Sequence, residues 1–143
     1  MDPKALKEKF RPIFYPRSIA VVGAANDDRK FGTRYLRALL IAGYQGKLYA
    51  INPYETGVLG LPTYPTVRDI PEPVEYVIMA VPKRFAPAIF DDCAARGVKV
   101  VQMFTAGFRE TGREEDRRLE DELVRKAQEG GFHIVGPNCI GVY

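Results

Sequence analysis

Glycines, small polar residues and two cations follow the first apolar run of the chain, and this combination is suited to binding a phosphate group. The stretch SIAVVGAANDDRKFG occupies residues 18–32. Gly23 would let the chain turn sharply and approach a ligand, while Gly32 would lie at or near the start of a helix. Free N–H groups at a helix start attract a phosphate, and Lys30 and Arg29 could add charge-assisted contacts. The plainer alternative is an ordinary strand-to-helix turn, which also favours glycine.

The same loop departs from the dinucleotide fingerprint G-x-G-x-x-G. Ala25 stands where the second glycine belongs, and Asp28 stands where the third belongs. A dinucleotide site also needs a carboxylate about 20 residues further on, at the end of the second strand, to bind the ribose hydroxyls. That strand ends here in YAINPYE, with Asn52 and Pro53 in its place. An NAD(P)-dependent oxidoreductase domain is therefore the weakest of the alternatives.

Three side chains outside the loop carry reactive groups, but none stands in a catalytic pattern. His133, the one histidine, has no carboxylate or metal partner in view, so we expect it to be structural or part of a pocket wall. Cys139 would need a nearby positive charge or helix start to be a nucleophile, and we expect a small buried residue instead. Cys93 and Cys139 lack metal-ligand spacing, so we expect two reduced thiols, no metal site and no catalytic residue.

A dense run of charge, GFRETGREEDRR, occupies residues 107–118. Such a run is usually a solvated loop and helix start. Thr111 followed by Glu114 predicts a capping box for the last helix. The alternative is that Arg109 or Glu110 faces a partner domain.

Length and charge exclude several classes of protein. The chain has 143 residues, enough for one compact domain, and its net charge of +3 comes from 21 basic and 18 acidic residues. No run of like charge marks a nucleic-acid arm, and no stretch is apolar enough to span a membrane. The N-terminus MDPKALKEKF is too charged for a signal peptide, so we expect a cytoplasmic protein with no nucleic-acid or membrane partner.

Short β-branched runs alternate with helical patterns, which predicts successive βα units and a parallel sheet covered on both faces. The predicted strands cover residues 18–22, 47–52, 76–81, 98–104 and 133–135, with a minor strand near 61–64. Residues 53–73 hold five prolines and two glycines, so we expect a loop with at most a short strand and one helical turn.

Apolar residues at helical spacing predict the helices between these strands. They are Phe31, Tyr35, Leu36, Leu39 and Leu40, then Phe85, Ile89 and Cys93, then Leu119, Leu123 and Ala127 before Gly130 and Gly131. The predicted fold is α/β and Rossmann-like: a doubly wound, mainly parallel sheet of five or six strands with helices on both faces. An N-terminal lead, residues 1–16, precedes a single domain at residues 17–143.

Four stretches together resemble the CoA-binding domain of the NDP-forming acyl-CoA synthetases, a family that includes the α subunit of succinyl-CoA synthetase. They are FYPRSIAVVGAANDDRKFG, YAINPYETGVLGLPTYPTVRDIPEPVEYVIMAVP, TAGFRETG and GPNCIGV. They cover nearly the whole chain from Phe14 onward, in the family's order and spacing.

The resemblance implies that the first loop wraps the adenosine-phosphate end of coenzyme A and that strand ends line the rest of its path. The residues implied in the loop are Gly23, Ala24, Ala25, Asn26, Lys30, Phe31 and Gly32. Those at strand ends are Asn52, Pro53, Val81, Pro82, Thr105, Ala106 and Gly107, with Asn138 and Cys139 nearest the thiol. Tyr54 stands where many relatives have a lysine for a CoA phosphate; it could stack on adenine or donate its hydroxyl.

The chemistry of CoA agrees with the residues at the second strand end. CoA carries a 3′-phosphate on its ribose, so a carboxylate there would repel it, and Asn52 is the better residue. We therefore expect no acidic side chain beside the phosphate loop. We also expect Gly32→Asp to abolish CoA binding by placing a carboxylate at the phosphate site, while the fold stays largely intact.

The resemblance implies a role in an acid–thiol ligase. Its synthetases activate an acid through a phosphorylated histidine in a following domain, so we expect CoA or acyl-CoA as ligand and phosphohistidine and ATP-grasp domains or subunits as partners. Without the phosphohistidine domain, we expect the chain alone to be inactive. The alternative is a stand-alone protein that senses or carries CoA or acyl-CoA.

Overall fold

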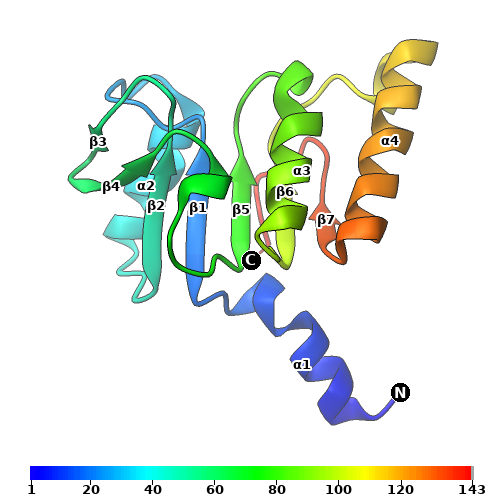
Figure 1. Cartoon of the computed structure of the whole chain (residues 1–143), viewed down its shortest axis with the longest axis horizontal. Helices are drawn as coiled ribbons and strands as arrows, with labels where there is room; N and C mark the ends of the chain where they lie inside the picture. The colour runs from blue at the N-terminus through cyan, green and yellow to red at the C-terminus, as the bar shows by residue number, and fades with distance from the viewer. Residues whose placement is uncertain (143) are drawn as a thin grey trace.

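The computed structural model describes residues 1–142, which form a central sheet with helices on both faces (Figure 1). The strands are β1 (Ser18–Val22), β2 (Lys47–Ile51), β3 (Gly57–Val58), β4 (Leu61–Tyr64), β5 (Tyr76–Met79), β6 (Val100–Met103) and β7 (His133–Val135). The α-helices are α1 (Pro3–Phe14), α2 (Phe31–Ile41), α3 (Ala86–Ala95) and α4 (Glu114–Gly130), and short 3-10 turns lie at Val67–Asp69, Lys83–Phe85 and Arg109–Thr111.

The sheet has the order β3-β4-β2-β1-β5-β6-β7, and every neighbouring pair except β3 and β4 is parallel. The doubly wound, mainly parallel fold predicted from the sequence is confirmed, with seven strands in the described chain rather than five or six. The chain leaves β1 on one side toward β2 and later returns to its other side as β5. The strand order therefore reverses at β1, where open α/β sheets bind ligands.

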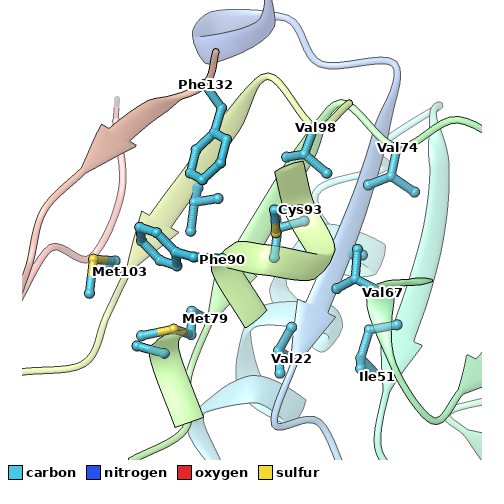
Figure 2. Close-up of a cluster of buried hydrophobic side chains, with 14 of the residues drawn as sticks. Val22, Ile51, Val67, Val74, Met79, Phe90, Cys93, Val98, Met103 and Phe132 are labelled. Carbon is cyan, nitrogen blue, oxygen red and sulfur yellow. The ribbon is translucent and has the colours of Figure 1, made fainter. Parts of the chain in front are cut away.

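Alternate residues of each central strand enter different cores, as the period of a strand requires. On one face, Ala20 and Val22 of β1 join the cluster under α3 and α4, where Phe90 is fully buried. Figure 2 shows Phe90, with Cys93 and Phe132, among the side chains of this cluster. On the other face, Val21 packs with Leu36 of α2.

The predicted N-terminal lead contains helix α1, which extends away from the sheet in Figure 1. The side chain of Asp2 accepts a hydrogen bond from the Ala5 N–H and so caps this helix. Arg11 holds the helix to the domain through a 2.6 Å ion pair between its Nη2 and Oε1 of Glu75. This contact raises the pKa of Arg11.

The capping box predicted for the last helix is wrong. Helix α4 begins at Glu114 with Arg113 as its N-cap, and no side chain makes a cap hydrogen bond there. The Thr111 hydroxyl donates instead to Oδ2 of Asp116, at 2.6 Å. Gly112 takes a left-handed conformation, φ 76°, and the N-cap falls on Arg113, so Thr111 lies outside the helix and contacts Asp116 in its first turn.

No helix within residues 1–142 has the length and apolar character needed to cross a membrane. In the same part of the chain, no three His, Cys, Asp or Glu residues gather where they could hold a metal ion.

Candidate functional site

Two adjoining cavities lie at the carboxyl ends of the central strands, around the switch point. The β2-side cavity, of about 510 Å³, extends from Asn52, Pro53 and Tyr54 to the start of α3. The β6-side cavity, of about 400 Å³, extends to Phe104, Thr105 and Asn138. Both cavities are lined by Lys30, Ala80, Val81 and Pro82, so together they form one continuous groove.

The loop between β1 and α2 begins with a glycine, Gly23, whose replacement by any other residue would destabilise the fold. Gly23 has φ +98°, and a Cβ atom there would lie 2.3 Å from the carbonyl oxygen of Ala80. The backbone at the end of β1 therefore packs directly on the end of β5. This close approach leaves the floor of the groove free of side chains at the switch point.

Gly32 is a packing residue, and the expected outcome of Gly32→Asp was wrong in one respect. A Cβ atom at this position would lie 2.5 Å from the carbonyl carbon of Gly23 and 2.6 Å from the backbone nitrogen of Ala24. Any side chain would force α2 away from the β1–α2 loop. The substitution would thus disturb the fold itself, and its effect on ligand binding would not identify a phosphate contact.

An acidic side chain does lie beside the loop, contrary to the expectation from the sequence. Glu55 accepts hydrogen bonds from the backbone N–H of Asn26 at 3.1 Å and from its side-chain Nδ2 at 2.8 Å. Asn26 also donates to the carbonyl of Gly57 at 2.7 Å. The sequence placed Asn52 at the strand end correctly, but the chain turns back after it and brings Glu55 against the loop. Asn26 is therefore occupied by the protein's own groups.

The remaining loop contacts are also largely internal. Ala24 is fully buried, and its carbonyl accepts a 2.9 Å hydrogen bond from Nδ2 of Asn52. The Ala25 N–H donates to the hydroxyl of Thr33 at 3.0 Å. These bonds fix the β1–α2 loop against α2 and the end of β2. A loop that is already fixed loses less conformational entropy when a ligand binds.

Free amide donors lie at the first turn of α2. Lys30 is the N-cap of this helix and makes no side-chain cap hydrogen bond. No group in the described residues accepts from the backbone N–H of Phe31, Gly32 or Thr33, as helix geometry leads one to expect. The positive end of the helix dipole and the Lys30 ammonium therefore stand at the junction of the two cavities.

The cations around the groove differ in whether an acid already neutralises them. Arg29 makes two 3.0 Å hydrogen bonds to Asp27, which lower the pKa of that carboxyl to about 2. Lys30 and Arg84 line the groove and form no salt bridge within residues 1–142. These two cations are available to a bound anion.

Aromatic rings form one wall of the β6-side cavity. The rings of Phe31 and Phe104 lie 4.5 Å apart between centroids, and Tyr35 meets Phe104 edge to face at 5.8 Å. The hydroxyl of Thr105 donates to the carbonyl of Val81 at 2.6 Å and ties the ends of β5 and β6 together. This half of the groove suits a long, weakly polar group.

Charges behind the β6-side cavity are paired within the protein. Lys83 donates to the carbonyl of Gly107 at 2.7 Å and forms an ion pair with Asp116, whose side chain is only 4% exposed. Hydrogen bonds from Lys83, Thr111 and Arg113 lower the pKa of Asp116 to about 2. This network fixes the turn that follows β6.

Glu110 and Arg109 also belong to this turn. Glu110 accepts from the N–H of Gly107 at 2.6 Å, which lowers the pKa of its carboxyl. Arg109 contacts Asp121 at 2.5 Å. Gly107 thus has both backbone groups occupied and lines neither cavity.

The cysteines and the histidine form no ion pair and no hydrogen bond with another side chain within residues 1–142. Cys93 is fully buried, and burial raises the pKa of its thiol. Cys139 is half-buried next to Asn138, with its Sγ 3.6 Å from the carbonyl of Gly141. His133 lies at the start of β7, and its ring packs at 5.5 Å from that of Phe10. Both cysteines are free.

Most residues predicted for the site line the groove. They are Gly23, Ala25, Lys30, Phe31, Asn52, Pro53, Tyr54, Val81, Pro82, Thr105, Ala106 and Asn138. The others, Ala24, Asn26, Gly32, Gly107 and Cys139, lie beside or beneath it and support its shape.

Sequence reasoning missed Arg84 and Phe104, which also line the groove. The signal was present, because Phe104 ends one predicted strand, in QMFTAG, and Arg84 follows the end of another by three residues, in VPKRF. The sequence alone does not show which of the two adjacent cations after β5, Lys83 or Arg84, faces the groove. The structure answers this by pairing Lys83 with Asp116.

The fold and groove define a class: a Rossmann-like domain with an elongated groove, lined by cations and aromatic rings, across the switch point of its sheet. Residues 17–143 match the CoA binding domain family, and the chain belongs to that family.

Two curated relatives are similar over most of this chain. One is subunit alpha of the ADP-forming acetate–CoA ligase II of Pyrococcus furiosus, 45% identical over 90% of this chain and 28% of the relative. The other is the ADP-forming acetate–CoA ligase I of Archaeoglobus fulgidus, 38% identical over 91% of this chain and 18% of the relative. The chain thus spans less than a third of the length of these relatives.

Two solved structures show the same fold. The apo form of the dinucleotide-forming acetyl-coenzyme A synthetase 1 of Korarchaeum cryptofilum superposes with a TM-score of 0.87 and 43% identity, over 92% of this chain and 28% of that one. A hypothetical protein from Pyrococcus horikoshii superposes with a TM-score of 0.73 and 27% identity, over 94% of this chain and 85% of that one.

Proposed function

We propose that the chain binds coenzyme A along the groove and acts as the CoA-binding unit of an NDP-forming acyl-CoA synthetase. The observation that carries this is the placing of the groups along the groove: Arg84 lies in the β2-side cavity and Lys30 at the junction, while the rings of Phe31 and Phe104 line the β6-side cavity. CoA has a matching arrangement, with a phosphorylated nucleotide at one end and a long thiol-bearing arm at the other.

The proposed orientation follows from the free charges. The pyrophosphate lies at the start of α2, near the N–H groups of its first turn and the Lys30 ammonium. The nucleotide occupies the β2-side cavity beside Asn52 and Tyr54. The pantetheine arm passes Phe31 and Thr105 toward Asn138, and Cys139 lies beside the cavity.

The chain supplies a thiol substrate in this proposal and carries out no chemical step alone. Its single histidine lies in the packing between β7 and α1, where it meets a phenylalanine ring and no acid. The phosphorylated histidine and the ATP-grasp unit of the complete ligase are therefore proposed to reside on partner domains or subunits.

Thermal unfolding with a panel of nucleotides tests this function. A ligand that binds only the folded protein adds about 2.7 kcal/mol of stability at 100 times its Kd, so CoA should raise the melting temperature by several degrees. ATP, NAD and NADP should give clearly smaller shifts. A shift of the melting temperature with NAD and none with CoA would overturn the proposed CoA binding. Formation of acyl-CoA by the chain alone would overturn the proposal that it carries out no chemical step by itself.

A second candidate is a stand-alone protein that senses or carries CoA or acyl-CoA. The similar protein from Pyrococcus horikoshii favours it, because this chain covers 85% of that chain. The length of the polypeptide that an antibody to this domain detects in native extract separates the candidates. A protein near 16 kDa supports the stand-alone role, and a much longer one supports the ligase.

A further inference from the structure

We propose that Arg84 binds the ribose 3′-phosphate of coenzyme A and so makes the site prefer CoA over dephospho-CoA. This inference rests on the proposed function, because it assigns one phosphate of that ligand to one side chain.

Besides Lys30, which lies at the junction of the two cavities, the β2-side cavity has one cation without a salt bridge in the described residues, Arg84. Arg84 stands in the turn after β5, whereas Tyr54 follows β2, and both line the same cavity. Tyr54 is 93% exposed and has no cationic group with which to neutralise a phosphate dianion. Arg84 can meet a phosphate with two parallel hydrogen bonds.

Neighbouring charges leave this role to Arg84. Lys83, the preceding residue, is held by Asp116 and the carbonyl of Gly107. Asp92, the acid on the same cavity wall, is bound by Nε of Arg68 at 2.9 Å. No acid in the described residues forms an ion pair with Arg84.

The guanidinium is also held in place before a ligand arrives. Its central carbon lies 4.5 Å from the ring centroid of Phe85, which lines the same cavity. A cation over an aromatic face is attracted to it and keeps its hydrogen-bond donors pointing outward at the edge. Less side-chain freedom is then lost when the phosphate binds.

Binding of CoA and dephospho-CoA to the wild-type chain and to Arg84→Gln tests the assignment by titration calorimetry. The two ligands differ only in the 3′-phosphate. Wild type should bind CoA about tenfold more tightly than dephospho-CoA, and Arg84→Gln should bind both with similar affinity, close to that of wild type for dephospho-CoA. An unchanged preference in Arg84→Gln would overturn the inference, as would a wild type that binds both equally.

Two further variants show whether the effect is local. Lys30→Gln should weaken both ligands by a similar factor, because the pyrophosphate is common to them. Arg125→Gln removes one cation from the outer surface of α4, where Arg125 pairs with Glu129 at 3.0 Å, and should change neither affinity. If Arg125→Gln also lost the preference for CoA over dephospho-CoA, the preference would depend on the net charge of the protein. That result would overturn the role of Arg84.

The pH dependence of the preference for CoA over dephospho-CoA is a further test, because replacing a purely structural residue would not change it. The second pKa of a phosphate monoester is about 6, so the wild-type preference for CoA should grow from pH 5.5 to 7.5 as the dianion forms. The ratio in Arg84→Gln should stay flat. If wild type binds neither ligand at any pH, the proposed function fails, and that result is distinct from binding without preference.

Discussion

The two halves of the groove differ in how their charges are balanced. Arg84 in the β2-side cavity and Lys30 at its junction with the other cavity form no salt bridge in the described chain. Behind the β6-side cavity, Lys83 and Asp116 neutralise one another, and Glu110 is bound by backbone N–H groups. Lys30 and Arg84 are both exposed, so they can meet a ligand from solvent, whereas the buried Asp116 carboxylate needs its partner within the protein. The difference indicates which half receives the charged part of a ligand.

The largest expected effect comes from the backbone contact that both halves share. Gly23→Ala should lower the free energy of unfolding by about 3 kcal/mol or more, because its Cβ would meet the Ala80 carbonyl and the residue has positive φ. Gly107→Ala, also at positive φ, meets only the flexible end of Lys83 at 3.4 Å and should cost about 1–2 kcal/mol. Urea unfolding measures the free energy of unfolding of both variants. Equal losses of stability would contradict the expected difference between the two glycines.

Next in size is the internal charge network of the β6 side. Asp116→Asn should lower the melting temperature at pH 7 by about 5 °C, because Lys83 and Arg113 lose their acceptor. The control Asp121→Asn removes a half-exposed acid that pairs with Arg109. This variant should lower the melting temperature by about 1 °C or less. A shift as large for Asp121→Asn would show that general surface charge, not the buried pair, is responsible.

The same pair predicts an acid dependence of stability. The pKa of Asp116 is lowered from 3.8 to about 2, mainly by its hydrogen bond with Lys83. Its stabilising effect is therefore complete above about pH 4 and lost as pH falls toward 2. The difference in melting temperature between wild type and Asp116→Asn should shrink over this range. A constant difference would mean that the carboxylate charge contributes nothing.

A smaller effect is expected from adding one negative charge to each half of the groove. Asn52→Asp should weaken CoA about tenfold, since it places a carboxylate in the β2-side cavity and removes the donor to the Ala24 carbonyl. Asn138→Asp in the β6-side cavity should weaken CoA by less than about threefold. Equal losses would mean that the phosphates are not confined to the β2 side.

The smallest effects concern the two thiols. Cys139→Ser should change CoA affinity by less than about twofold, because the side chain lies beside the cavity and not in it. In the native protein, Cys139 should react with a thiol reagent well before Cys93, whose burial raises the pKa of its thiol. A large loss of affinity in Cys139→Ser would make this residue a direct contact.

Regular features were predictable from the sequence because they depend on local pattern. The central strands lie within the predicted ranges, and the minor strand near 61–64 is confirmed as β4. The two-residue strand β3 was missed because glycine and proline surround it and only pairing with β4 defines it. Helix α1 was missed because its sequence is highly charged, and its contacts with the domain, Arg11 with Glu75 and Phe10 with His133, join residues far apart in the chain.

Features of the site that depend on distant contacts were not predictable. Asn26 and Glu55 are separated by 29 residues, so their hydrogen bonds exist only once β2 has turned back toward the loop. Gly32 has the residue type and position of a phosphate-binding glycine, yet backbone packing alone explains it. A motif shows which residues gather near a ligand, whereas only the three-dimensional packing shows which of them have a free group to offer.

Both borders of the sheet end in very short strands, with two residues in β3 and three in β7. A border of this length offers few unpaired backbone groups to a foreign strand, which guards against edge-to-edge aggregation. It also limits how this unit can be joined to others. We expect neighbouring domains or subunits to dock against its helices and turns, not to lengthen its sheet, so that the groove keeps its shape whatever surrounds it.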